Sequence, residues 1–492
     1  MKDAVQTDSD FLFGGPRRVA GTQAGPLAGW VLASLVFVLF AVNAALHFPG
    51  VMNNDSIGQY RDAVSGRYGD WHPPIMAWTW SYLRFVGEGP APFLLLHLAL
   101  YWTGFGLIAD GLRRAGHPKT ALAVTLAGAF PPFLYVNAQV VKDVGMAVSW
   151  LAAVGGLFWF RVQLRRVPVG WGLAIAAVVF YGAMVRTNAI FGLGPLLLLA
   201  FAPNRWLRSV RLLVAAVLVA IVALPVGAVA NRLLFNPIPQ HAVQSLFMFD
   251  LMGIAVHTGD PAVLEPRATL AKEDLHACYS PYWWDSMSPW GRCAAKVHRP
   301  AGVDMPTLPD GLAAQWARSI AEHPVAYAQH RLKHFNSALL FAVPLKHIRL
   351  TPEYGTGDPR VAPLEVVTER DVRMDLLRKN PAVWPVTWLA WAACLLVLLR
   401  REPPVAHVAL ARVLAVSALG YSGAYLLIGV ATDMRYHYWS LLAVLLATLA
   451  VTPRLGQWLR KRDRELLASA ALVALIVAIG LAARLSDFRG LM

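Results

Sequence analysis

The apolar stretch GWVLASLVFVLFAVNAAL (residues 29–46) is followed a few residues later by the polar tetrapeptide Asn53-Asn54-Asp55-Ser56. A helix crosses a lipid bilayer with about 20 apolar residues at 1.5 Å each. The stretch is longer than the roughly 7–15 apolar residues of a signal peptide, and no convincing cleavage site of small residues follows it. We therefore predict a retained transmembrane helix that ends in polar groups at one membrane face.

Similar apolar stretches recur along the chain, separated by short polar connections. The 492 residues are 57% hydrophobic and their mean hydropathy is +0.48, which is more apolar sequence than one soluble core can bury. The pattern predicts an all-α polytopic membrane protein of about eleven transmembrane helices. They are expected near residues 28–48, 92–112, 119–138, 143–160, 168–186, 188–202, 209–231, 382–399, 408–430, 438–452 and 466–484.

The basic residues cluster between these apolar stretches. A net charge of +15 can attract nucleic acid, but no basic arm or face is present, so we expect no nucleic-acid partner. Short basic connections are instead typical of the cytoplasmic side of a membrane protein. Alternating sides from a cytoplasmic N-terminus places every such cluster inside: Arg17 and Arg18; Arg113, Arg114 and Lys119; Arg161, Arg165 and Arg166; Arg205, Arg208 and Arg211; Arg400 and Arg401; Arg454 and residues 460–464. The same alternation places these charges outside: Asp55, Asp70, Lys142, Arg186 and Arg435.

One apolar run, IMAWTWSYLRFVG (75–87), is too short to cross and is rich in the Trp and Tyr that favour the headgroup region. A crossing there would move the following basic clusters outside. Just before it, Ile57, Tyr60 and Val64 recur at helical spacing. We therefore predict that loop 49–91 forms two juxtamembrane helices joined by GRYGDWHPP. The alternative is an unstructured loop.

Four segments follow from this topology. They are a cytoplasmic tail (1–27), an N-terminal transmembrane module (28–231), a large extracytoplasmic loop (232–381) and a C-terminal transmembrane module (382–492).

Within the large loop, residues 310–322 and 324–338 have helical composition. Cys278 and Cys293 share this loop and can pair there, which would contribute about 3 kcal/mol for a ring of this size. Two free thiols are the alternative.

Three histidines of the large loop, His323, His330 and His334, can be interpreted as a metal cluster. No carboxylate or cysteine lies within the stretch 323–334 that holds them, so an interfacial amphipathic helix explains them better. We assign no metal-ligating residue from the sequence.

Polar residues of the first external loop have two interpretations. Asp55 or Ser56 can cap the helix that starts near Ile57, and Asp70 or His72 can cap the next one. Ionisable groups at membrane depth are otherwise paired or functional. Two prolines after His72 restrict the backbone there, which favours a defined geometry.

Three cations are expected on the same membrane face as Asp55: Lys142, Arg186 and Arg435. Each has a structural alternative, since Lys142 can pair with Asp143 as an anchor and Arg435 can extend to the interface. Together they would form a site for an anionic headgroup beside a general base. An amphiphilic phosphate donor fits such a site.

These residues resemble those of the GT-C glycosyltransferases, in particular the protein O-mannosyltransferase and lipid A aminoarabinose transferase branch of bacteria. The resemblance lies in an acid after the first helix, the HPP motif at 72–74, and the stretches VVKDVGMA, RTNAIFGL and DMRYHYW. Eleven spans with a large external loop after the seventh are also similar. One difference is that the mannosyltransferases have Asp-Glu in loop 1, where Asp55 is here followed by Ser56.

The resemblance implies a fold, a reaction and a location. The donor would be a polyprenyl-phosphate sugar, transferred with inversion to a hydroxyl of a protein, lipid or polysaccharide acceptor at the outer face of the cytoplasmic membrane. Asp55 would be the base, while Arg186, Lys142 and Arg435 would hold the phosphate. The resemblance leaves the requirement for a divalent metal open, because members of the superfamily differ in it. The residues expected to order the substrate or the loop are Asn54, Asp70, His72, Asp143 and Tyr436.

Two other classes of function remain. A transporter or flippase for a lipid-linked anion would have charges at mid-membrane and interrupted helices. A non-enzymatic scaffold subunit would leave Asp55 without a role in proton transfer.

Overall fold

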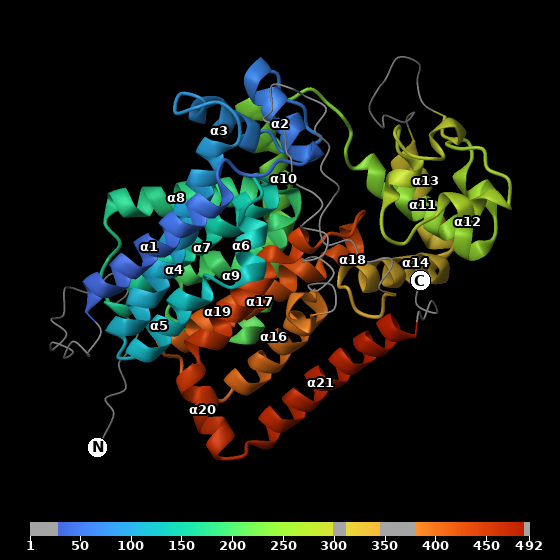
Figure 1. Ribbon diagram of the computed structural model, residues 1–492. Helices are drawn as coiled ribbons and strands as arrows, with labels where there is room; N and C mark the ends of the chain where they lie inside the picture. Colours follow the sequence, from blue (N-terminus) through green and yellow to red (C-terminus); the bar gives the residue numbers. More distant parts are fainter. Residues whose placement is uncertain (1–27, 299–310, 345–379, 487–492) are drawn as a thin grey trace.

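The computed structural model describes residues 28–298, 311–344 and 380–486, and the predicted cytoplasmic tail lies outside these ranges. Within them the regular elements are helices, and extended backbone pairs only in isolated bridges (Figure 1). Six helices are long and apolar enough to cross a membrane, or up to nine if each of three bent pairs is one span. The protein is therefore an all-α, multi-pass membrane protein. The six are α1 (Gly29–His47), α4 (Ala91–Arg114), α7 (Lys142–Val162), α10 (Ser209–Phe235), α17 (Ala406–Gly423) continued by α18 (Tyr425–Ile428), and α21 (Arg464–Leu485).

The expected number of eleven spans stays a prediction, and two places account for the difference. The sequence count treats α8 (Val169–Met184) and α9 (Ile190–Phe201) as two spans, whereas they form one of the bent pairs, with an angle of 114°. It also includes α16 (Pro385–Leu399), which has only 15 residues and is shorter than the roughly 20 that a bilayer requires. The other bent pairs are α5 (Pro118–Ala127) with α6 (Pro131–Asn137), and α19 (Tyr438–Ala450) with α20 (Thr452–Arg460).

Helix α7 lies at the centre of the bundle and is almost wholly buried. Its 21 residues give a length of about 30 Å, close to the thickness of the hydrocarbon core. Lys142 and Asp143 lie at its first turn and Arg161 at its last. The polar chemistry and the basic end of the bundle are therefore about one membrane thickness apart.

Close packing of α7 against α4 depends on two glycines that face each other. A Cβ atom at Gly155 would lie 2.8 Å from the carbonyl oxygen of Gly104. A Cβ at Gly104 would lie 2.5 Å from the side chain of Leu151 and 2.9 Å from the backbone nitrogen of Ala152. Small residues let two membrane helices approach this closely, because their packing relies on van der Waals contact.

Replacing Gly104 by Ala is expected to destabilise the bundle by about 1–3 kcal/mol, since backbone must move to admit the methyl group. Gly106, on the same helix, is the matched control, because its Cβ would meet Val36 at an ordinary 3.5 Å. Gly106→Ala should be neutral or slightly stabilising. Thermal unfolding of both variants in detergent measures the difference, and equal stability of the two would contradict the proposed contact.

Arginines close the carbonyl ends of helices at the basic end of the bundle. Arg161 donates to the carbonyl oxygens of Leu199 and Ala202, the second at 2.8 Å, at the end of α9. Arg412 donates to the carbonyl of Leu399 at the end of α16. The last carbonyls of a helix have no partner within it, so these contacts satisfy buried acceptors that lipid cannot.

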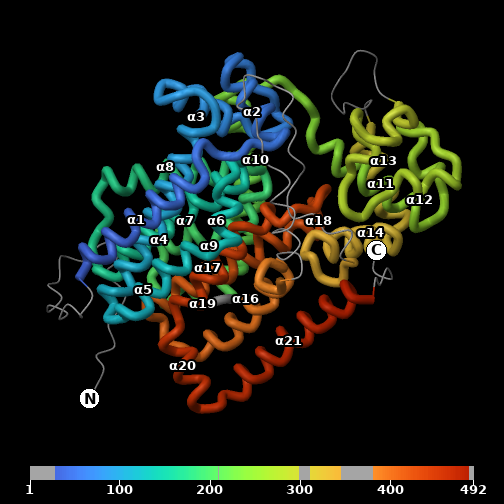
Figure 2. The backbone as a smooth tube through the Cα atoms, viewed as in Figure 1, coloured from blue at the N-terminus to red at the C-terminus, as the bar shows by residue number. Residues whose placement is uncertain are grey.

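Loop 49–91 forms two short helices, α2 (Asn54–Ser65) and α3 (Ile75–Leu83). This confirms that the loop contains two helices, and the unstructured alternative is wrong. At nine residues, α3 is too short to cross a membrane. Figures 1 and 2 show α2 and α3 at one end of the bundle and α20 at the opposite end.

The described part of the large loop forms a second helical body beside the end of the bundle that carries α2 and α3 (Figure 1). It contains α11 (Gln244–Thr258) and α12 (Asp274–Cys278), and a disulfide joins Cys278 to Cys293. The two stretches expected to be helical are confirmed as α13 (Leu312–Glu322) and α14 (Pro324–Ala338).

Two histidines of α14 are packed against α11. His330 and His334 are fully buried, and His330 Nε2 lies 3.2 Å from Oδ1 of Asp250 on α11. The carboxylate missing from the local sequence therefore comes from a distant helix. No group of three or more ligating side chains that could hold a metal is found among residues 28–298, 311–344 and 380–486.

Candidate active site

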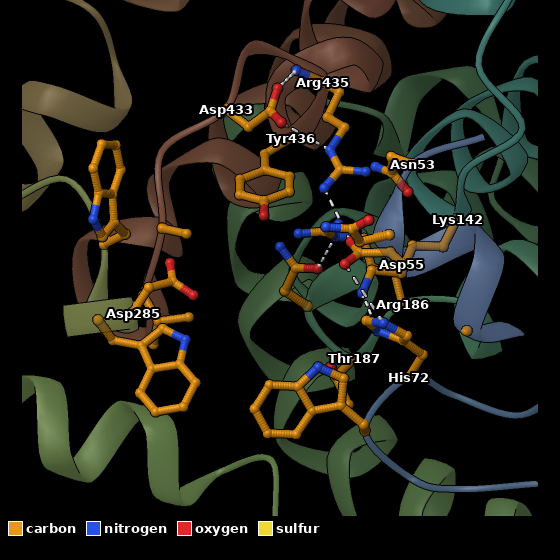
Figure 3. A pocket seen from close by; sticks show the side chains of 18 of the residues that line it. Asn53, Asp55, His72, Lys142, Arg186, Thr187, Asp285, Asp433, Arg435 and Tyr436 are labelled. Carbon is orange, nitrogen blue, oxygen red and sulfur yellow. Dashed lines mark hydrogen bonds and ion pairs between the residues drawn. The ribbon is translucent and has the colours of Figure 1, made fainter. Parts of the chain in front are cut away.

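A cavity of about 1080 Å³ opens where the polar ends of several helices meet (Figure 3). Its walls come from the loop around α2, the start of α7, the break between α8 and α9, the connection after α18 and the large loop. Seven of the residues singled out from the sequence line it: Asn54, Asp55, His72, Lys142, Arg186, Arg435 and Tyr436. Asp143 is buried next to the cavity and contacts Arg186. Asp70 does not line the cavity.

The cap of α2 is Asn53, which corrects the capping interpretation of Asp55 and Ser56. The Asn53 side chain accepts a 2.9 Å hydrogen bond from the backbone N–H of Ser56. Ser56 Oγ in turn donates to the carbonyl of Val140, just before α7. Asp55 therefore lies in the first turn of α2, where the helix dipole favours a carboxylate, and its loop is fastened beside the start of α7.

His72 connects Lys142 to Asp55. The N-terminus of α3 has no side-chain cap, so neither Asp70 nor His72 caps it. His72 Nδ1 lies 2.6 Å from Lys142 Nζ, and Nε2 lies 3.7 Å from Asp55 Oδ1. Burial and the charge of Lys142 lower the pKa of His72 to about 3. The imidazole is then neutral, accepts from the ammonium at Nδ1 and presents Nε2–H to Asp55.

Arg435 lies at the centre of the carboxylates. Its guanidinium donates to Asp55 Oδ2 at 3.0 Å and to Asp433 Oδ2 at 2.9 Å, and its Nε lies 3.9 Å from Asp143 Oδ2. Arg435 is 4% exposed, whereas the Asp55 side chain is 30% exposed and faces the cavity. The buried guanidinium thus holds a carboxylate that remains accessible to a ligand.

Arg186 is held from three sides. It donates to Asp143, to Asn188 Oδ1 at 2.9 Å and to the hydroxyl of Tyr425 at 2.6 Å. Its guanidinium also lies 4.5 Å above the ring of Tyr436, a cation–π contact. Because Asp143 contacts Arg186 and also neighbours Arg435, the predicted acid and cations form one continuous network.

The carboxyl groups of the site differ in their protonation. Burial alone would raise the pKa of Asp55, but His72, Arg435 and Lys142 outweigh it and hold that pKa well below its usual range. Burial raises the pKa of Asp433 to about 7 against the opposing charge of Arg435. Asp55 is therefore ionised at neutral pH, and Asp433 titrates close to neutrality.

Asp70 orders the loop and does not line the cavity. Its side chain accepts from the backbone N–H of Gln240, and its own N–H donates to the carbonyl of Ile238 at 3.1 Å. The side chain of Gln240 in turn accepts a 2.9 Å hydrogen bond from the backbone N–H of Trp71. These bonds join loop 1 to the segment after α10, next to the HPP motif.

Sequence reasoning missed several residues of the cavity. Asp433 stands in the stretch DMRYHYW noted from the sequence, but no role was assigned to it. The density of tryptophan between 283 and 290 was a weak signal, and nothing in the sequence placed that segment beside loop 1. The missed lining residues include Trp71, Trp283, Trp284, Asp285 and Trp290.

Comparisons of the chain with protein-family models, with curated proteins and with solved structures gave no significant match.

The raised pKa of Asp433 predicts a pH-dependent affinity for anions. As the pH falls through about 7, Asp433 gains a proton and the site becomes one unit more positive. An anionic phosphodiester, whose own charge is constant in this range, should bind more tightly at pH 6 than at pH 8. Asp433→Asn should show a smaller change of affinity between the two pH values than the wild type, and the same pH step in both proteins would exclude Asp433 as a contributor.

Proposed function

We propose that the chain is an integral membrane glycosyltransferase of the GT-C type that moves a sugar from a polyprenyl-phosphate donor to a hydroxyl acceptor with inversion. One observation carries the proposal. An accessible ionised carboxylate and three cations from four distant parts of the sequence share one cavity at the end of the helical bundle. A cavity of this volume suits a lipid-linked saccharide better than a single small metabolite.

The donor phosphate would lie among Lys142, Arg186 and Arg435. Arg435 Nη1 is buried without a hydrogen-bond partner, so the site has a spare donor for a phosphate oxygen. As the bond between the anomeric carbon and the phosphate oxygen breaks, negative charge develops on the leaving polyprenyl phosphate. Fixed cations stabilise that charge without reorganisation.

Asp55 would accept the proton of the acceptor hydroxyl while the hydroxyl oxygen forms a bond to the anomeric carbon. A carboxylate paired with Arg435 is a weak base, since a general base works best with a pKa near the operating pH. A phosphate that competes for Arg435 would loosen this pair and strengthen Asp55 as a base. Donor binding would thereby activate the acceptor side of the reaction.

The proposal includes a location and a topology. The site would face the outside of a bacterial cytoplasmic membrane, because disulfides persist in oxidising compartments and Cys278–Cys293 lies in the same body as the cavity wall. Eleven spans would require α8 and α9 to cross separately and α16 to cross as well. The membrane would thin locally around the short helix α16, or neighbouring helices would shield its ends from lipid.

The carboxylates of the site do not form a metal centre. Asp55, Asp143 and Asp433 each contact an arginine, and no cluster of three ligating groups is found in the described part of the chain. We route no step of the reaction through a metal.

Asp55→Asn should lower transfer by about 10²–10⁴-fold, the usual contribution of a general base. Mass spectrometry of membrane glycolipids and surface glycans would compare a deletion strain complemented with the wild type or the variant. Asp260→Asn is the matched control, because the exposed Asp260 caps a 3₁₀ helix of the large loop and Asn preserves a cap. Glycans restored fully by Asp55→Asn would remove the proposed base.

Transport of a lipid-linked anion is the second candidate, because Arg186 lies in the break between α8 and α9. Interrupted helices that carry a charge at the break are typical of transporters. Purified protein in proteoliposomes separates the two functions. Given a synthetic polyprenyl-phosphate sugar and an acceptor lysate, a transferase should release polyprenyl phosphate, whereas a transporter should move the intact lipid between leaflets and release none.

A further inference from the structure

The cavity has a second wall that the proposed donor chemistry does not use. Figure 3 shows Asp285 of the large loop across the cavity from Asp55, His72 and Arg186. Around it, the rings of Trp71, Trp284 and Trp290 form a cluster, with centroids 5.9 Å, 6.1 Å and 5.7 Å apart. We call these three rings with Asp285 the aromatic wall. All four residues line the cavity.

The aromatic wall is attached to the connection that carries the arginine of the site. The backbone N–H of Trp284 donates to the carbonyl of Val430 at 2.9 Å, and Trp283 forms an isolated bridge with Ala431. Asp433 and Arg435 follow directly in that connection. Any group bound to the wall is therefore held in a fixed relation to the proposed catalytic groups.

The disulfide restrains the other side of the wall. Cys278 and Cys293 close the segment that contains it, and the N–H of Cys293 donates to the carbonyl of Ser286 at 2.9 Å. Trp290 remains 58% exposed, while its indole N–H donates to Asp285 Oδ1 at 2.9 Å. A large apolar ring is thus kept at the cavity with its orientation fixed by a carboxylate.

Planar indole faces beside a carboxylate match one class of ligand. The C–H face of a pyranose packs on an aromatic ring, and its hydroxyl groups donate to carboxylate oxygens. A phosphate would instead prefer the opposite wall, where Lys142, Arg186 and Arg435 lie. We propose that the aromatic wall binds a saccharide, as the acceptor of the transfer. This assignment of the acceptor class rests on the proposed function.

The test measures binding separately from transfer. The protein, extracted without glycosidic detergent and placed in nanodiscs of sugar-free phospholipid, is applied to an array of defined oligosaccharides. The wild type should bind a subset of them, and Trp290→Ala should bind that subset about tenfold more weakly, the loss of one stacking contact. Trp290→Phe, which keeps a ring, should recover most of the affinity.

Two controls fix the interpretation. Trp206→Ala removes a ring of similar exposure, 52%, that does not line the cavity, and it should leave binding unchanged. Asp55→Asn should keep saccharide binding while it loses transfer, because the base lies on the other wall.

Different failures have different meanings. Absence of saccharide binding by the wild type, equal binding by Trp290→Ala, or binding of peptides instead on a parallel array would each overturn the saccharide subsite. Loss of transfer in Asp55→Asn would still support the glycosyltransferase in those cases. Conversely, ring-dependent saccharide binding without any transfer would leave the subsite standing and remove the reaction.

Discussion

The pairing of Arg435 with three carboxylates is the interaction on which the site depends. Charges in a low-dielectric interior are stable only when they are paired and hydrogen-bonded. Asp55 comes from α2, Asp143 from α7, and Asp433 from the connection that also carries Arg435. Satisfying one guanidinium thus draws together three regions that are far apart in the sequence.

The second arginine extends this network into the membrane helices. Arg186 contacts the same Asp143 and lies between α8 and α9, so the break in that helix pair places a charge at the cavity. Buried pairs of this kind contribute little net stability compared with an apolar core. Their retention at a cavity, with Arg435 Nη1 still unpaired, favours a functional explanation over a structural one.

Much of the fold could be predicted from the sequence, because lipid imposes simple rules on length and charge. The short run at 75–87 could not cross, and basic connections indicated one face, which gathered Asp55, Lys142, Arg186 and Arg435 opposite them. Spans that are bent, or shorter than about 20 residues, were harder to predict. The 114° bend between α8 and α9 brings Arg186 to partners from distant segments, and local composition does not specify it.

The rest of the site depends on contacts between distant segments. The cap at Asn53 was misassigned because Asn, Asp and Ser are all good caps and stand together in loop 1. The surroundings of His330 could not be predicted because its partner Asp250 comes from another helix. The most direct measurement is a structure of the protein with polyprenyl phosphate in nanodiscs. The phosphate should lie within hydrogen-bond distance of Arg435 and Lys142, with Asp55 released from Arg435. A phosphate bound at the basic end of the bundle, with the Asp55–Arg435 pair intact, would contradict the proposed site.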